Sequence, residues 1–459
     1  MSTTVPVNPP SRATTLPLPP GPRGYPLVGV LPYLRRDPLR LLTAVQRRYG
    51  DVVKLGDQRM FFVTRPEHIQ NILHASERRY NKGPLLSKLR AGLGDGLLTS
   101  EGDHWRRQRR LMQPAFHRQR LAHFGAIMSG AAEELCADWQ PRAAHGEPIN
   151  VAAAMMGLTL TIVSRALFSH DTSNDAEIIR RSLNIALPIT ERRFWSFINM
   201  PERAPTPDNI RFRRAIAAID DVVFRIIAAR RRSDVDQGDL LAMLLQARDE
   251  ETGAQMSDQQ LRDEVITLLL AGHDTTANLL SWTFYLLSRH PSVESKVYAE
   301  VSAVLGGRTP AVADLASLPY TRMVIDEVLR LYPPAWIIGR SPIAEEQLGG
   351  YRIPANALVL ISPYVTHRHP EFWPNPEGFD PERFSPEMQD ARPRYAYFPF
   401  GGGPRICIGN NFALMEAHLI LATVIQRYRL DLIPGYPAPP RPMVTLHAGN
   451  GVWMLLHPR

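Results

Sequence analysis

The alternation of apolar and polar positions predicts a chain dominated by helices. Helical periodicity prevails from about Asp103 to His290. Its most informative part is a helix expected to begin at Asp258, where Ser257 and Gln260 form a capping box, and to end near His290, before a proline. Such a helix is about 50 Å long. It would cross the molecule, so its middle must be buried.

The other predicted elements are shorter. The pattern predicts a β-rich stretch at Val52–Thr64, a helix between Pro319 and Pro333, β segments at Tyr351–Pro363 and a helix at Asn410–Arg429. Phe372–Pro399 is rich in proline and aromatic residues and is expected to be a long meandering surface segment held by packing. A hairpin at Gly449-Asn450-Gly451 is expected to close the chain. The predicted class is mainly α with small β-sheets, an α+β fold.

Length and composition predict one domain with an extended N-terminal arm. The chain has 459 residues, 44% of them hydrophobic, and no linker in its middle separates two cores. We therefore expect a single domain over residues 26–459. Residues 1–25 should run extended over the surface, because prolines interrupt regular structure at Pro6, Pro9, Pro10, Pro17, Pro19, Pro20 and Pro22.

Charge and cysteine content exclude several classes of protein. Two cysteines, Cys136 and Cys407, provide no disulfide framework and are typical of a reducing compartment, the cytoplasm. The nearest candidate for a membrane span, Val265–Leu287, has His273 and Asp274 at its middle, so no span is predicted. The net charge of +8 is not gathered into a nucleic-acid-binding module.

The loop Phe400–Gly409 reads FGGGPRICIG and places Cys407 just before a predicted helix. Its glycines let the backbone approach a flat ligand. The N–H groups at the helix start favour a thiolate over a thiol, and Arg405 can meet a carboxylate of the ligand. The alternatives are a buried structural thiol, as we expect for Cys136, a zinc site, which lacks further ligands nearby, and a nucleophile with His418 as its base.

Three further motifs contain polar residues that need partners. Ala271–Thr276 reads AGHDTT and falls at the middle of the long helix. Glu327 and Arg330, at i and i+3, can form a charge-assisted pair, and Trp105 and Arg109 lie in the basic block WRRQRR. For AGHDTT the alternative is hydroxyls bonded back to the helix and a salt-bridged aspartate. For the basic block it is a solvated helix face.

Together these motifs resemble those of the cytochrome P450 superfamily. FGGGPRICIG is similar to its haem-binding loop, AGHDTT to its oxygen-binding helix, and Glu327-Val328-Leu329-Arg330 to its Glu-x-x-Arg signature. PERF, at Pro381–Phe384, resembles the meander that completes this signature, and Trp105 and Arg109 match the Trp-x-x-x-Arg helix. The resemblance runs from about Pro19 to the C-terminus. It implies the cytochrome P450 fold, with the long central helix over a haem.

The resemblance implies roles for individual residues. Cys407 would be the proximal ligand of the iron in haem b, where a thiolate donates electron density for oxygen cleavage. Asp274 and Thr275 would be the acid and alcohol that deliver protons, with Gly272 leaving room for dioxygen. Glu327, Arg330 and Arg383 would form a structural triad. The haem is expected to contact Trp105, Arg109, Arg340 and Arg405 at its propionates, and Ala271, Gly272, Phe400, Gly401 and Gly409 elsewhere.

The implied activity is that of a monooxygenase, which inserts one oxygen atom from O2 into an apolar fatty acid, terpenoid or steroid-like substrate. Leu270, Ala335, Trp336 and Ile337 are expected to line its pocket. The sequence contains no flavin or iron–sulfur module, so electrons from NAD(P)H would reach a monomeric enzyme through a ferredoxin or flavodoxin and its reductase. Two alternatives remain, a peroxide-using or rearranging haem-thiolate enzyme and a haem sensor without catalysis.

Overall fold

The computed structural model describes residues 16–25, 29–56, 59–75, 78–169, 173–194, 203–233 and 235–459. Residues 1–15 of the expected N-terminal arm lie outside the described residues. The described part of the arm has no regular secondary structure and is held by backbone hydrogen bonds. The Lys54 amide donates to the Pro20 carbonyl at 2.9 Å, and the Arg352 amide donates to the Pro17 carbonyl at 3.0 Å. The arm therefore contacts strands of two separate sheets.

Helices build most of the molecule, and many have proline in the first turn. Proline is tolerated there because an N–H at this position would have no acceptor within the helix. The first half contains α1 (Leu31–Arg36), α2 (Pro38–Tyr49), α3 (Pro66–His74), α4 (Pro84–Ser87), α5 (Arg90–Leu93), α6 (Gly102–Met112), α7 (Arg118–Leu121), α8 (Gly125–Ala144), α9 (Val151–Phe168), α10 (Ser173–Phe194), α11 (Pro207–Arg232) and α12 (Leu240–Gln246). The second half contains α13 (Asp258–Arg289), α14 (Pro291–Leu305), α15 (Pro319–Leu331), α16 (Pro363–Thr366), α17 (Pro386–Asp390) and α18 (Asn410–Arg427). Short 3-10 helices occupy Gln113–Phe116, Ala122–Phe124, Val312–Ser317, Pro381–Phe384, Arg394–Ala396 and Gly403–Arg405.

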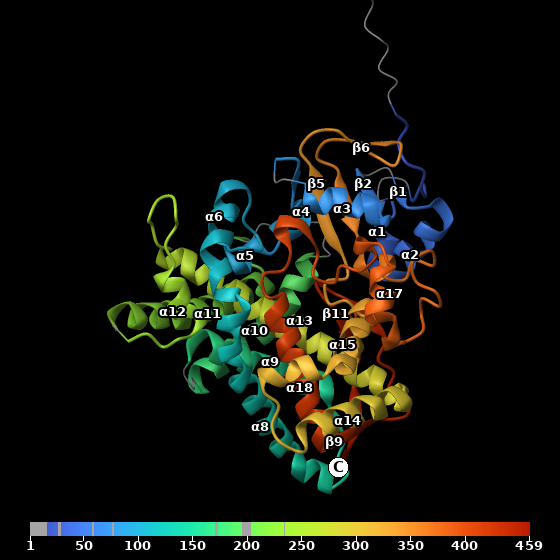
Figure 1. The fold of residues 1–459 in the computed structure, drawn as a ribbon. Coiled ribbons are helices and arrows are strands. Elements are labelled where there is room, and N and C mark those ends of the chain that lie inside the picture. Colours follow the sequence, from blue (N-terminus) through green and yellow to red (C-terminus); the bar gives the residue numbers. More distant parts are fainter. Residues whose placement is uncertain are drawn as a thin grey trace, which may run out of the picture.

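The strands form small sheets at the edge of this helical mass. The largest has the order β1 (Val52–Lys54), β2 (Met60–Val63), β8 (Leu358–Ile361), β5 (Ile338–Pro342), β3 (Tyr80–Asn81), with β2 and β8 parallel. A second joins β4 (Ile149–Asn150), β12 (Trp453–Pro458) and β9 (Tyr428–Leu432). Two pairs complete the set, β6 (Glu346–Leu348) with β7 (Tyr351–Ile353) and β10 (Pro440–Pro442) with β11 (Leu446–Ala448). In Figure 1, β1, β2 and β5 lie to one side of α13 and α18, and α8 to α12 lie to the other.

The long helix α13 is the axis of the core. The Ser257 side chain accepts a hydrogen bond from the Gln260 amide at 3.3 Å, and the Gln260 side chain accepts one from the Ser257 amide at 2.9 Å. The predicted capping box is therefore confirmed. Helices α9, α11, α15 and α18 pack around α13, which buries apolar residues along most of its length. This arrangement places its polar middle inside the protein.

Of two sequence predictions about the C-terminal half, one is wrong and the other agrees with the structure. Gly449–Gly451 does not form a hairpin, because it connects β11, which pairs with β10, to β12, which pairs with β4 and β9. The glycines signal a turn, but packing decides which strands pair. The segment Phe372–Pro399 is held by packing, as the sequence predicted, since Trp373, Phe384 and Tyr395 are buried. These aromatic rings gain stability by removing apolar area from water.

The helix α9 has the length and apolar composition of a membrane span, which the sequence-based search overlooked. It is the single helix of the described residues that meets those two criteria, and 61% of it is buried inside the protein. In the fold α9 packs along α13. Its apolar character is accounted for by a place in the core.

Candidate functional site

The loop Phe400–Gly409 folds tightly and presents Cys407 just ahead of α18. The Cys407 amide donates to the Phe400 carbonyl at 3.0 Å, which closes the loop. Gly403 has a φ of +64°, and a Cβ there would lie 2.1 Å from the Leu73 carbonyl oxygen, so only glycine fits. At the start of α18 the Gly409 N–H donates a hydrogen bond to the Cys407 sulfur.

Cys407 keeps exposed surface in this loop. Burial raises its pKa, whereas the Gly409 N–H and the Arg109 guanidinium act to lower it. Ala271, near the middle of α13, is likewise exposed although His273 on the same helix is buried. These are surfaces that a haem bound through Cys407 would cover. The residues present therefore fit the predicted cofactor.

Three cationic side chains, Lys82, Arg340 and Arg405, gather around the carboxylate of Glu101. Arg405 Nη2 donates to Glu101 Oε2 at 2.7 Å, and its Cζ lies 5.2 Å from the centre of the Trp105 ring. Its buried Nη1 has no hydrogen-bond partner among the described residues. Burial, and then the neighbouring cations, lower the pKa of Arg340 to about 10 and that of Lys82 to about 7, opposed by Glu101. The surplus positive charge fits a ligand with carboxylates, such as the haem propionates.

Two of the four residues expected at the propionates, Arg340 and Arg405, belong to this cationic cluster, and a third, Trp105, packs against Arg405. The fourth, Arg109, contacts the cysteine loop instead, because its Nη1 donates to the Ile406 carbonyl and its Nε to the Gln113 side chain, both at 2.8 Å. Lys82 belongs to the cluster but was missed by sequence reasoning. Its Nζ donates to two backbone carbonyls at 2.8 and 2.6 Å. A single lysine outside any motif gave no signal.

The middle of α13 places a hydroxyl and a carboxylate in different surroundings. Thr275 Oγ1 donates to the Ala271 carbonyl at 2.7 Å, the back-bonded arrangement weighed as an alternative. Asp274 accepts a hydrogen bond from the Thr445 hydroxyl, and its Oδ1 lies 3.3 Å from His447 Nε2. Burial acts to raise the pKa of Asp274, but His447 and Thr445 outweigh it and lower that pKa. Asp274 is therefore a carboxylate at neutral pH.

Gly272 is constrained by helix packing. A Cβ at this position would lie 3.1 Å from Val163 Cγ2 on α9. The missing side chain therefore lets α9 and α13 approach closely. The sequence suggested room for dioxygen as the reason for this glycine, whereas in the fold its side-chain direction is taken by α9.

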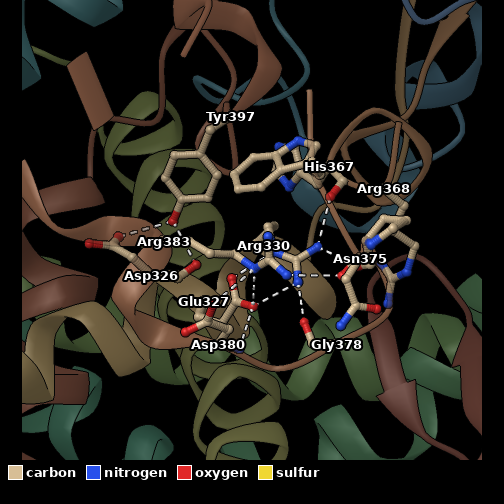
Figure 2. Close-up of polar contacts among 12 residues, drawn as sticks. Asp326, Glu327, Arg330, His367, Arg368, Asn375, Gly378, Asp380, Arg383 and Tyr397 are labelled. Atoms are coloured by element: carbon tan, nitrogen blue, oxygen red, sulfur yellow. Dashed lines mark hydrogen bonds and ion pairs between the residues drawn. The ribbon is translucent and has the colours of Figure 1, made fainter. Parts of the chain in front are cut away.

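The pair Glu327 and Arg330 lies fully buried on α15 (Figure 2). Arg330 Nε and Nη2 donate to the two carboxylate oxygens of Glu327 at 2.6 and 2.7 Å, and its remaining N–H groups donate to the carbonyls of His367, Pro376 and Gly378. Arg383 Nε lies 3.5 Å from Glu327 Oε1. The structure therefore brings the three expected members of the triad together. They tie α15 to the meander ahead of the cysteine loop.

The expected pocket residues have different environments. Ala335 is exposed, and Leu270 and Ile337 are partly buried. Trp336 is fully buried, and its Nε1 donates to the Met443 carbonyl at 2.9 Å. With no exposed surface, Trp336 is a core residue and does not line a pocket. A bulky apolar residue next to a pocket motif cannot be told from a core residue by sequence alone.

Other polar residues of the interior were not found by sequence reasoning. Thr445 and His447 meet Asp274 from the β10–β11 hairpin, more than 170 residues away in the chain. Glu416 on α18 is fully buried beside the Thr276 hydroxyl, and burial raises its pKa well above the usual value. No group of three or more His, Cys, Asp or Glu side chains suited to a metal ion occurs in the described ranges.

Comparison with known proteins agrees with this geometry. A family model described as Cytochrome P450 matches residues 19–453. The chain is 41% identical to cyclooctatin synthase of Streptomyces melanosporofaciens over 93% of each chain, and 39% identical to cyclooctat-9-en-7-ol 5-monooxygenase of the same organism over 93% of this chain and 92% of that one. The crystal structure of the cytochrome P450DA heme domain is similar with a TM-score of 0.89 and 30% identity, covering 97% of this chain and 98% of that one. The chain therefore belongs to the cytochrome P450 family and is a haem b monooxygenase that receives electrons through redox partner proteins.

Proposed function

We propose that this monooxygenase inserts oxygen into a cyclic terpenoid and holds its haem iron through Cys407. The observation that carries the proposal is the exposed Cys407 just ahead of α18, where the Gly409 N–H and the Arg109 charge act to lower the pKa of its thiol. A haem bound through a thiolate supplies the activation of O2. The residues of the chain bind and orient that group, admit the substrate and supply protons.

The cationic cluster and Trp105 would hold the haem propionates. Among the described residues, the buried Nη1 of Arg405 has no hydrogen-bond partner, and Arg340 Nη1 donates to the neighbouring Gly339 carbonyl at 2.8 Å. Guanidinium groups bind carboxylates with two parallel hydrogen bonds, so propionates would satisfy both side chains. Arg109 would stabilise the Cys407 thiolate by its charge, because it acts on that thiol rather than on the cluster.

Asp274 and Thr275, on α13, would accept protons and pass them on, on the side of the haem opposite Cys407. The Thr275 hydroxyl donates to the Ala271 carbonyl, so its oxygen remains free to accept a hydrogen bond. Asp274 is a carboxylate whose oxygens face Thr445 and His447. A carboxylate in this position can take a proton from one side and give it up on the other.

The terpenoid assignment rests on apolar residues and on similarity. Leu270, Ala335 and Ile337 provide apolar surface close to the expected site, which favours a hydrophobic ligand. One relative that is 39% identical acts on cyclooctat-9-en-7-ol. A cyclic terpenoid therefore agrees better with the comparisons than a fatty acid or a steroid.

The chain would act as a cytoplasmic monomer with a ferredoxin or flavodoxin as its immediate electron donor. The arginines beside Trp105 give limited support to a basic docking face. Arg110 pairs with Asp249 at 3.0 Å and also with Glu251. Much of the positive charge in this block is therefore already paired within the protein.

The ligand assignment is tested with Cys407→Ser, with Cys136→Ser as the matched control. Cys136 is buried, and burial raises its pKa to about 12, so it is a packing residue. The reduced carbon monoxide complex of the parent and of Cys136→Ser should show the red-shifted Soret band of thiolate ligation. Cys407→Ser should lack that band. Retention of the band in Cys407→Ser would refute the assignment.

The substrate class is tested by optical titration of the haem-loaded protein. Cyclic terpene alcohols, long-chain fatty acids and steroids of similar size should be added in parallel. We expect a shift of the haem Soret band with the terpene alcohols at the lowest concentrations. A larger or tighter response to a fatty acid or a steroid would overturn the terpenoid assignment and leave the monooxygenase activity in place.

A further inference from the structure

The carboxylate of Asp274 is bound to a polar group on the β10–β11 hairpin. The Thr445 hydroxyl donates to Asp274 Oδ2 and lies 2.9 Å from His447 Nε2. His447 Nε2 also lies 3.3 Å from Asp274 Oδ1. Asn278 Nδ2 donates to Thr445 Oγ1 at 3.2 Å and to the Asp274 carbonyl at 2.8 Å, which fixes the hairpin against α13.

The direction of these hydrogen bonds follows from the donors available. The Thr445 hydroxyl has one proton and gives it to Asp274, because a carboxylate only accepts. The Thr445 oxygen must then accept from His447 Nε2, which requires that this nitrogen carry a proton. A continuous chain of hydrogen bonds therefore leads from His447 through Thr445 to Asp274. His447 Nε2 also contacts Asp274 Oδ1 directly.

The charges around His447 favour the protonated ring. Burial acts to lower the pKa of His447, but the hydrogen bond and charge of Asp274, assisted by Glu191, outweigh it and raise that pKa. Arg441, the cross-strand partner of His447, acts in the opposite direction. Burial lowers the pKa of His273 on α13, so that ring stays neutral.

Glu191 on α10 is the second carboxylate of this group. It accepts a hydrogen bond from the Val444 amide at 3.0 Å, at the turn of the hairpin. Burial raises its pKa to about 7, opposed by the charge of His447. Two carboxylates therefore flank the imidazole, and one of them exchanges protons near neutral pH.

His447 keeps more exposed surface than the carboxylate that it contacts. Its side chain is 24% exposed, whereas that of Asp274 is 16% exposed. An imidazole with exposed surface can exchange protons with water that reaches it, while its Nε2 faces Thr445 and Asp274. Because Asp274 is a carboxylate, it has no proton of its own to give at neutral pH.

We propose that His447 is the proton donor to Asp274, and that the β10–β11 hairpin thereby connects the oxygen side of the haem site to solvent. This inference rests on the role proposed for Asp274 and Thr275. The Nε2–H bond of the imidazolium breaks, Thr445 Oγ1 gains that proton as it passes its own to Asp274 Oδ2, and neutral imidazole remains. Water then returns a proton to the imidazole. His447 is a positioning residue, since it acts through Asp274.

The first test measures the imidazole itself, apart from turnover. The haem-loaded protein, reduced and bound to carbon monoxide, is labelled with ¹³C-histidine and titrated by NMR from about pH 5 to 9. The His447 resonance is identified by its loss in His447→Gln. Asp274→Asn should lower the midpoint of the His447 titration by roughly one pH unit or more, because the flanking charge is removed. An unchanged midpoint would overturn the inference.

The second test measures, as a function of pH, how the electrons taken from NAD(P)H divide between product and hydrogen peroxide. In the parent, with a ferredoxin or flavodoxin system and an accepted terpenoid, the share of electrons released as hydrogen peroxide should rise above the His447 midpoint, since the imidazolium is lost there. In His447→Gln and His447→Asn, product formation should fall by roughly tenfold or more at neutral pH, and the pH dependence should flatten. A purely structural role would lower activity equally at all pH values, and that result would overturn the proposal.

His457 provides the matched control. It pairs with Asp431 at 3.1 Å on the exposed β9–β12 sheet, so His457→Gln removes a similar histidine–aspartate contact without touching the site. In this variant we expect electrons to be coupled to product formation as in the parent, with the same dependence on pH. If His447→Gln also couples like the parent while Thr275→Ala still releases peroxide, the inference fails and the proposed function stands. If Cys407→Ser retains the thiolate band, the proposed function itself fails.

Discussion

The guanidinium of Arg330 gives every one of its N–H groups to an acceptor inside the protein. Arg330→Ala would leave the Glu327 carboxylate buried without its main partner, which typically costs 3–5 kcal/mol. We expect little or no haem-loaded protein from this variant, measured by yield and haem content. Arg352→Ala removes a surface pair with Glu345 at 3.2 Å and should change stability by about 1 kcal/mol or less. Equal yields from the two variants would contradict the prediction.

Glu416 is a buried acid that favours its protonated form, because burial raises its pKa. Its ionised form is gained on unfolding, so the free energy of unfolding falls as pH rises above the usual glutamate pKa, by up to about 1.4 kcal/mol per pH unit. Glu416→Gln removes this dependence. The stability of the variant relative to the parent should therefore increase from pH 5 to pH 8, measured by denaturant unfolding at both values. The exposed replacement Glu345→Gln should show no such trend, and a flat difference for Glu416→Gln would refute the argument.

At the scale of elements, α13 combines a structural and a chemical role in adjacent residues. Its hydroxyl groups bond back to the helix, as Thr275 does to Ala271 and Thr283 does to Leu279 at 2.8 Å. Thr283 is fully buried, whereas Thr275 keeps exposed surface. Both hydroxyls donate to the carbonyl four residues earlier, but only the Thr275 oxygen keeps surface at which a further hydrogen bond can be accepted.

This difference predicts the outcome of replacing each threonine by alanine. Thr275→Ala should still consume NAD(P)H with a ferredoxin or flavodoxin system but release mostly hydrogen peroxide, because the accepting hydroxyl is lost. In this variant, product formation driven by added hydrogen peroxide should be reduced less than product formation driven by NAD(P)H. Thr283→Ala should couple electrons to product as the parent does. If both variants couple like the parent, the proton role of Thr275 is wrong and a peroxide-using enzyme becomes the better hypothesis.

At the scale of the whole molecule, the haem site joins segments from distant parts of the chain. Lys82 precedes α4, Trp105 lies on α6, Arg340 on β5 and Arg405 in the cysteine loop. The three cations among them share the single carboxylate of Glu101 in the interior, where charge without enough counter-charge is costly. Binding of a ligand with two carboxylates would relieve that cost and stabilise the fold by mass action.

Arg340→Met tests this charge balance. Arg340 is buried, and burial lowers its pKa to about 10. The variant should raise the melting temperature of the haem-free protein, because a desolvated charge is removed, and weaken haem binding. The gap between the melting temperatures of haem-loaded and haem-free protein should therefore narrow. Arg340→Lys keeps the charge and should leave most of the gap. A wider gap in Arg340→Met would contradict the prediction.

The sequence by itself determined the elements and motifs whose causes lie within a short stretch of chain. The capping box of α13 needs residues three apart, the Glu327–Arg330 pair needs one helical turn, and the cysteine loop needs its own glycines. The resemblance of these motifs predicted the cytochrome P450 fold, the haem and the monooxygenase activity, all of which are confirmed. Local periodicity and hydrogen bonding suffice for such features.

Only the tertiary structure decided which distant residues meet. It joined His447 and Thr445 to Asp274, added Lys82 to the cationic cluster, and placed Trp336 in the core. It also paired β11 with β10 instead of β12, and enclosed α9, whose composition alone fits a membrane span. These outcomes depend on the packing of the whole chain. No single segment determines which residues are buried or which strands pair.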